Sequence, residues 1–119
     1  MSREEFEKLI AEEFPRAVPE KFHSLIKNVE FIVEDEAPGK NLLGHYHGIP
    51  HVNRGDWYGV GGTLPDTITL YQKTIERHAA RTGESVAQVV RETIWHEVAH
   101  YFGYDEEQVR GREDERDTL

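Results

Sequence analysis

The sequence predicts an α+β fold in which helices flank a small mixed sheet. Apolar residues recur at helical spacing over residues 6–14 and again over 86–101. Residues 29–33 and 67–71 instead alternate with a period of two, which is typical of strands. No repeat, low-complexity tract or linker is visible in the 119 residues, a length that suits one domain. We therefore expect a single domain over residues 1–119.

The first third of the chain carries clear start and stop signals. Ser2 and Glu5 have capping-box spacing and predict the start of a helix that ends by Pro15. Pro19 predicts the start of a second, short helix. In the strand expected at residues 29–34, three apolar residues share one face, so half of it should be buried.

The middle of the chain is rich in glycine and proline, and most of residues 35–66 should form loops, with one short strand at 42–46. A loop segment of this length in a small domain is often functional. Residues 67–71 predict a second strand and 73–80 a helix. The longest helix should begin at Ser85, run to about Phe102 and be followed by one more helical turn over 105–110.

Composition limits the chemistry and the location. The chain has no cysteine, so any metal must be held by histidine, carboxylate or water. The net charge of −9 argues against a nucleic-acid partner, and we expect none. No signal peptide and no run of about 20 apolar residues is visible, so we expect a cytoplasmic protein without a membrane span. The oligomeric state is not indicated.

The longest predicted helix contains the motif His96-Glu97-Val98-Ala99-His100. Residues four apart lie on one helical face, about 6 Å apart along the axis, so two imidazoles can bind one tetrahedral Zn²⁺. Glu97 is rotated by about 100° and reaches the water on the metal rather than the metal itself. The motif predicts a zinc-dependent hydrolase in which Glu97 is the catalytic base. The alternative is a pair of solvated histidines on a helix edge, paired with Glu92 or Glu97.

A third protein ligand is expected after the helix. Gly103 lets the chain leave the helix and turn back, and Glu106 follows at the spacing at which zincins place a third ligand. Asp105 is the alternative, because a shift of one residue in the turn would exchange the two. Tyr101 and Tyr104 are further candidates for stabilising an oxyanion. So are three histidines of the glycine-rich segment, His45, His47 and His51, for which the alternative is a position in a solvated loop.

The chain resembles a small bacterial zincin-like family of zinc metallopeptidases, over nearly its full length. The resemblance is carried by Leu-Leu-Gly-His-Tyr-His-Gly at 42–48, by residues 64–71 and by residues 90–103. It implies a minimal zincin-like fold, a small sheet packed on helices, with His96 and His100 as zinc ligands, Glu97 as base and an acidic third ligand at Glu106. Metzincins have histidine at that last position and a methionine turn, whereas the only methionine here is Met1.

The leading functional hypothesis is a peptidase acting on peptides or small proteins. We expect an extended substrate to add as a strand to the edge of the sheet at residues 67–71. A second hypothesis is a metal-dependent endoribonuclease, because residues 96–105 also resemble bacterial rRNA-maturation endonucleases. Those enzymes lack a glutamate after the first histidine, so Glu97 and the net charge favour the peptidase. A third is a non-catalytic zinc-binding or interaction module.

Overall fold

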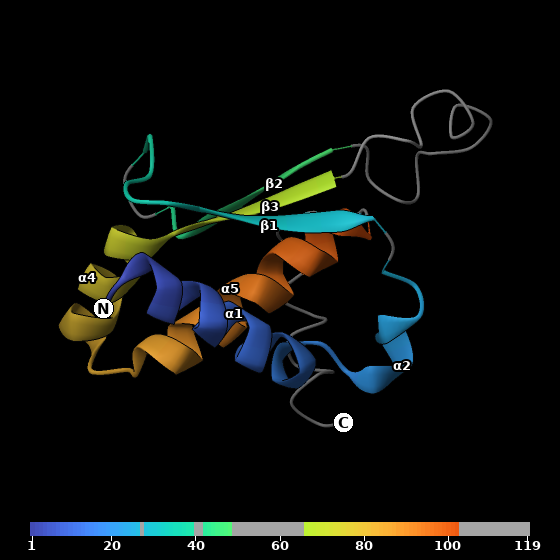
Figure 1. Cartoon of the computed structure of the whole chain (residues 1–119), viewed down its shortest axis with the longest axis horizontal. Helices are drawn as coiled ribbons and strands as arrows, with labels where there is room; N and C mark the ends of the chain where they lie inside the picture. Colours follow the sequence, from blue (N-terminus) through green and yellow to red (C-terminus); the bar gives the residue numbers. More distant parts are fainter. Residues whose placement is uncertain (27, 40–41, 49–65, 103–119) are drawn as a thin grey trace.

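The structure, a computed structural model, describes residues 1–26, 28–39, 42–48 and 66–102. Within these ranges it has an α+β architecture, as predicted. The elements in chain order are α1 (Arg3–Ala17), α2 (Glu20–His23), β1 (Val29–Glu34), β2 (Gly44–His47), β3 (Asp66–Tyr71), α4 (Gln72–Thr82) and α5 (Val86–Tyr101). Figure 1 shows the sheet above a layer of helices, with α1, α4 and α5 on the same side of it.

The sheet is mixed, and its strands are ordered β1-β3-β2. β1 runs parallel to β3, with Val29 opposite Asp66, and β2 runs antiparallel to it, with Gly44 opposite Leu70. The expectation that residues 67–71 form an edge strand is therefore wrong, because β3 is the central strand. Alternation reports which face of a strand is buried, but it does not report whether the strand has a neighbour on each side. Among the described strands, β1 and β2 form the edges of the sheet.

The two edge strands differ in what they present to solvent. β1 alternates as predicted, with Glu30, Ile32 and Glu34 exposed. Charges on an edge strand discourage pairing with another chain. β2 starts two residues later than expected and carries His45 and His47 on its exposed face.

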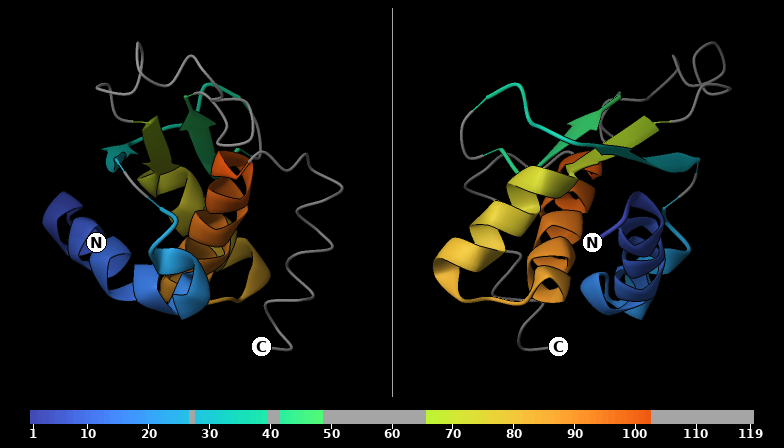
Figure 2. Two further views of the ribbon diagram at one scale, coloured as in Figure 1. Left: turned by 90° about the vertical axis from the view of Figure 1, so that its right-hand side faces the viewer. Right: turned by 60° about the vertical axis from the view of Figure 1, so that its left-hand side comes forward.

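The hydrophobic core lies between the sheet and the helices, with α5 at its centre. α5 packs against α1, α4, β2 and β3, and Figure 2 shows it between the other two long helices, under the sheet. Fully buried side chains come from each layer: Phe6, Ile68, Leu70, Ile75, Val90 and Ile94. The burial of so many side chains along α5 fixes its orientation relative to the sheet.

Helix α1 begins with the predicted capping box, because Ser2 and Glu5 exchange hydrogen bonds of 2.8 and 3.0 Å. It does not stop at Pro15 but continues to Ala17. A proline in the last turn removes a single backbone hydrogen bond. Ala17, beyond the proline, is fully buried, and this burial compensates for the lost bond.

A buried carboxylate joins α1 to α5. Glu13 is 3% exposed, and its two oxygens lie 2.9 Å from Nε of Arg91 and 3.3 Å from a guanidinium nitrogen of Arg16. Removing one partner of such a buried pair leaves an uncompensated charge and is strongly destabilising. The pair therefore fixes how α1 docks on the helix that carries the candidate site.

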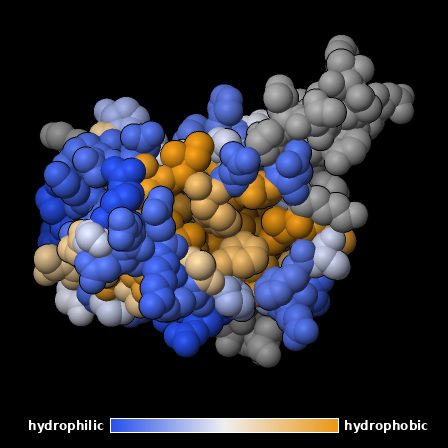
Figure 3. Space-filling view, viewed as in Figure 1, coloured by the Kyte–Doolittle hydropathy of each residue, from blue (hydrophilic) through white to orange (hydrophobic). Residues whose placement is uncertain are grey.

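An open apolar hollow of about 370 Å³ lies where α1 meets β1. It is lined mainly by Ile10, Phe14, Phe31 and Val33. Figure 3 shows an apolar region over this part of the face, surrounded by hydrophilic residues. The four residues that mainly line this hollow belong to the hydrophobic core or pack directly against it.

Candidate metal centre and active site

Helix α5 positions the motif residues. Ser85 caps it by accepting a 3.0 Å hydrogen bond from the backbone N–H of Gln88, as predicted, although the Gln88 side chain turns away to donate to Glu92. Most of the helix is buried, whereas His96 and His100 are half-buried. The prediction that these histidines lie at the edge of the core is confirmed.

The two histidine rings lie close together on one face of α5. Their centroids are 5.0 Å apart and their planes are inclined by 71°. Two imidazoles bound to one tetrahedral zinc at about 2.0–2.1 Å would have centroids about 5 Å apart. The spacing of the His96 and His100 rings therefore fits two ligands of one zinc ion.

Glu97 lies between these histidines in sequence but faces the protein rather than solvent. Its exposed fraction is 7%. Burial raises the pKa of the Glu97 carboxyl above its ordinary value, while His96, His100 and His45 oppose the rise electrostatically. The backbone amide of Tyr46 also opposes it by hydrogen bonding. Glu92, one turn before His96, is exposed and accepts a 3.1 Å hydrogen bond from the Gln88 side chain.

Strand β2 lies directly against the Glu97 face of α5, and Gly44 allows this approach. A Cβ atom on Gly44 would lie 2.7 Å from Cγ2 of Thr93, 3.0 Å from the carbonyl oxygen of Thr69 and 3.3 Å from Cγ of Glu97. The first distance is far below van der Waals contact. The absence of a side chain at residue 44 therefore lets the strand approach the helix at the level of Glu97.

The hydrogen-bond register of β2 determines which of its backbone groups remain available. Leu43 accepts a 3.0 Å bond from the backbone N–H of Tyr71, so residues 43, 45 and 47 are the ones bonded to β3. The backbone groups of Gly44 and Tyr46 therefore point to the outer edge of the sheet. The Tyr46 amide reaches Glu97 from this edge.

Comparison with known proteins identifies the family of this chain. The model of a family described as zincin-like metallopeptidases matches residues 26–116. The chain belongs to the zincin-like metallopeptidase family. A solved structure of a conserved hypothetical protein from Thermus thermophilus superposes with a TM-score of 0.55 at 26% identity, covering 93% of this chain and 99% of that one. No curated protein matches.

Zinc is the metal that zincin-like proteins typically bind, and the structure describes two of the three predicted ligands. His96 and His100 are together on α5, whereas Glu106 and its alternative Asp105 lie outside the described residues. Within residues 1–102, as far as they are described, no group of three histidine or acidic side chains is arranged to hold a metal. The third ligand of this zincin-like protein therefore stays a prediction.

The glycine-rich segment's histidines lie partly on a strand rather than in a loop. His45 and His47 share the exposed face of β2, with ring centroids 6.4 Å apart. His51 and Tyr104 are outside the described residues. Tyr101 is 2% exposed, which favours the packing role over a role at an oxyanion.

Sequence reasoning missed several residues that shape the site. Tyr46 packs edge-on against Tyr101, with centroids 6.1 Å apart, and its hydroxyl donates a 2.8 Å bond to Asp66. Asp66 is 6% exposed and Gly48 packs against it. The alternation of glycine and tyrosine with histidine over 44–48 was the available signal, since it puts Gly44 and Tyr46 on one face.

No helix in the described ranges is both long and apolar enough to cross a membrane.

Proposed function

We propose that this chain is a zinc-dependent metallopeptidase that hydrolyses peptide bonds in peptides or small proteins. The observation that carries the proposal is the geometry of α5 beneath the open edge of β2. There, two histidine rings spaced for one zinc ion lie beside a buried carboxylate, Glu97. Membership of the zincin-like metallopeptidase family supports the same reaction class.

In this proposal His96, His100 and Glu106 hold the metal. Zinc, when bound, lowers the pKa of a coordinated water to about 7 and polarises a carbonyl group. The chain has no cysteine, so a histidine and carboxylate ligand set is the one it can supply. Three protein ligands leave a fourth position open, as a catalytic zinc site requires.

Glu97 acts as the general base. Its carboxylate takes a proton from the attacking water and returns one to the leaving amine nitrogen. A base of this kind works best when its pKa lies near the working pH, and burial moves the pKa of Glu97 in that direction. The Tyr46 amide orients the carboxylate from the strand side.

The substrate pairs with the outer edge of β2 rather than with β3, since β3 is flanked on both sides. Gly44 directs its backbone N–H and carbonyl groups to that edge, and an extended peptide can form main-chain hydrogen bonds there, while the Tyr46 amide stays with Glu97. The edge adjoins Glu97, so a peptide bound along it passes the catalytic carboxylate.

The test compares zinc-loaded wild type with Glu97→Gln on a library of quenched peptides near neutral pH. Loss of a general base typically lowers activity by about two to four orders of magnitude. Glu92→Gln is the matched control, because it makes the same change on an exposed side chain of the same helix. Both variants should bind zinc as the wild type does.

Three results would contradict the proposal. Equal cleavage by wild type and Glu97→Gln would mean that the carboxylate is not the base. Zinc binding without cleavage by any of the proteins, together with a stable protein partner, would support a non-catalytic module. Salt-sensitive binding and cleavage of RNA would support an endoribonuclease.

A further inference from the structure

A polar hollow of about 390 Å³ opens where the chain enters β2. It is lined by one face of α4 and by the segment before the strand: Ala37, Pro38, Gly39, Leu43, Thr74, Arg77, His78 and Arg81. Its volume lies within the range of small-ligand sites. The charged and titratable side chains in this lining are two arginines and a histidine, in a chain whose net charge is −9.

The two arginines differ in their partners. Arg77 forms a two-pronged ion pair with Glu36, whose carboxylate lies outside the lining. Arg81 contacts Nδ1 of His78 at 3.1 Å. Among the described residues it makes no ion pair with a carboxylate. Its positive charge is therefore the one in the hollow that a bound anion can pair with.

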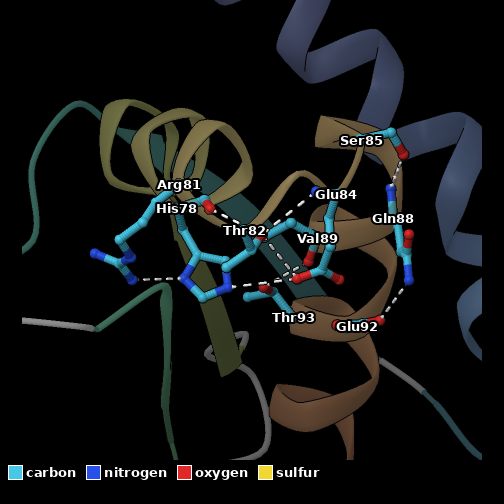
Figure 4. A network of polar contacts seen from close by, with 9 residues as sticks. All are labelled: His78, Arg81, Thr82, Glu84, Ser85, Gln88, Val89, Glu92 and Thr93. Carbon is cyan, nitrogen blue, oxygen red and sulfur yellow. Dashed lines mark hydrogen bonds and ion pairs between the residues drawn. The ribbon is translucent and has the colours of Figure 1, made fainter.

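His78 holds Arg81 in place. A guanidinium only donates hydrogen bonds, so Nδ1 of His78 accepts and its proton lies on Nε2. Nε2 faces Glu84 at 3.7 Å, and Glu84 also accepts a 3.1 Å bond from Thr82. Figure 4 shows the His78 ring between Arg81 and Glu84. This series of polar contacts, from Glu84 through His78 to Arg81, orients the Arg81 guanidinium as a donor at the hollow. The His78 side chain is 29% exposed, so most of its surface is covered by the rest of the protein.

The hollow lies next to the start of strand β2. Leu43, in its lining, directly precedes Gly44, which abuts Glu97. An antiparallel strand is the more stable addition to an edge, and it would run from His47 toward Gly44. Its C-terminus would then approach Leu43 and the arginines, whereas a parallel peptide would bring a positively charged amino terminus there.

We propose that this hollow binds the C-terminal carboxylate of the substrate peptide. Leu43, in the lining, and Gly44, beside Glu97, are neighbours in the chain, so a peptide paired antiparallel along β2 directs its C-terminal end toward the hollow. The substrate class is therefore short peptides with a free C-terminus, cleaved near that end. This selectivity rests on the peptidase function proposed above, but the binding of the carboxylate does not.

The test measures binding to the metal-free full chain, which separates it from catalysis. The probes are acetyl-trialanine with a free carboxylate and the same peptide as its amide, followed by the side-chain NMR signals of Arg81 and His78 and by calorimetry. A hydrogen bond to a charged group contributes a difference of about tenfold in affinity at an exposed site. The free acid should bind about tenfold more tightly than the amide.

Arg81→Gln should abolish that difference. Lys8→Gln is the control, since it removes a positive charge from an exposed position on α1, away from the hollow, and should preserve the difference. Equal binding of the two peptides, a difference that persists in Arg81→Gln, or no binding of either at millimolar concentration would each overturn the proposal. Binding of inorganic phosphate without the free-acid peptide would also overturn it, because the anion site would then be separate from the cleft.

Cleavage assays distinguish the two proposals. Preference for the free acid in binding, without cleavage by the zinc-loaded protein, would contradict the peptidase and leave the carboxylate site standing. Cleavage of both peptides at equal rates would contradict the carboxylate site and leave the peptidase standing.

Discussion

Replacing Gly44 by alanine tests the close approach of β2 to α5. The new methyl group would lie 2.7 Å from Cγ2 of Thr93, which has little freedom to move. Thr93 is buried, and its hydroxyl donates a 2.7 Å bond to the carbonyl of Val89, so turning the side chain away would break that bond. Overpacking of this kind costs about 1–3 kcal/mol. Reduced entropy of the unfolded chain returns about 0.4–1 kcal/mol.

The net loss in the free energy of unfolding should be about 1–2 kcal/mol. With a urea m-value of about 1–3 kcal/mol/M, the unfolding midpoint should fall by about 1 M. Gly39→Ala is the matched control, because a Cβ there meets nothing within 4 Å. It should leave the midpoint unchanged or raise it slightly.

A second-site change tests the mechanism itself. Thr93→Ser removes the methyl group that a Cβ at residue 44 would meet and keeps the hydroxyl, so it should recover much of the loss when combined with Gly44→Ala. The carbonyl oxygen of Thr69 at 3.0 Å limits that recovery. If Gly44→Ala behaves like Gly39→Ala, or if Thr93→Ser gives no recovery, the inferred close contact between β2 and α5 at Gly44 is wrong.

The remaining predictions concern the metal and the base. The chain should bind about one zinc per monomer, and His96→Ala or His100→Ala should abolish binding in metal analysis after chelation and reloading; full zinc in the double variant would place the site elsewhere. Glu106→Ala should weaken zinc binding strongly and Asp105→Ala much less, and the reverse order in a competition titration would reassign the third ligand. Glu97→Gln should stabilise the metal-free protein at pH 7, because burial raises the folded-state pKa of the Glu97 carboxyl, so its ionisation opposes folding as pH rises above the unfolded value. The gain should vanish in urea unfolding below pH 4, and a gain that persists there would contradict the electrostatic cause.

Local patterns predicted the helices and strands well because they depend on near neighbours in sequence. The caps at Ser2 and Ser85 and the alternation of β1 were readable for that reason. Pro15 was misread, since the burial of Ala17 beyond it is a tertiary effect. The position of β3 at the centre of the sheet was also out of reach, because strand order depends on the crossover between distant segments.

The candidate site was predictable where it depends on residues close in sequence and not where it depends on distant ones. His96, Glu97 and His100 share one helix, so their spacing alone put the two rings together. The contribution of β2 could not be foreseen, because the contact of Gly44 with Glu97 joins residues far apart in the chain. The pairing of Tyr46 with Asp66 has the same origin.

The family match begins at residue 26, whereas α1 ends at Ala17. Yet α1 supplies Phe6 and Ile10 to the interior, and burial of each such side chain is worth about 1.5–3 kcal/mol. Together they approach the lower end of the roughly 5–15 kcal/mol that holds a typical domain folded. A fragment starting at residue 26 would therefore expose the flank of α5 and leave Arg91 without its buried carboxylate. The aligned solved structure covers 93% of the chain, leaving out only about eight residues, so at least part of α1 belongs to the shared architecture. The segment that carries the family signature is thus shorter than the segment that builds the hydrophobic core of this chain.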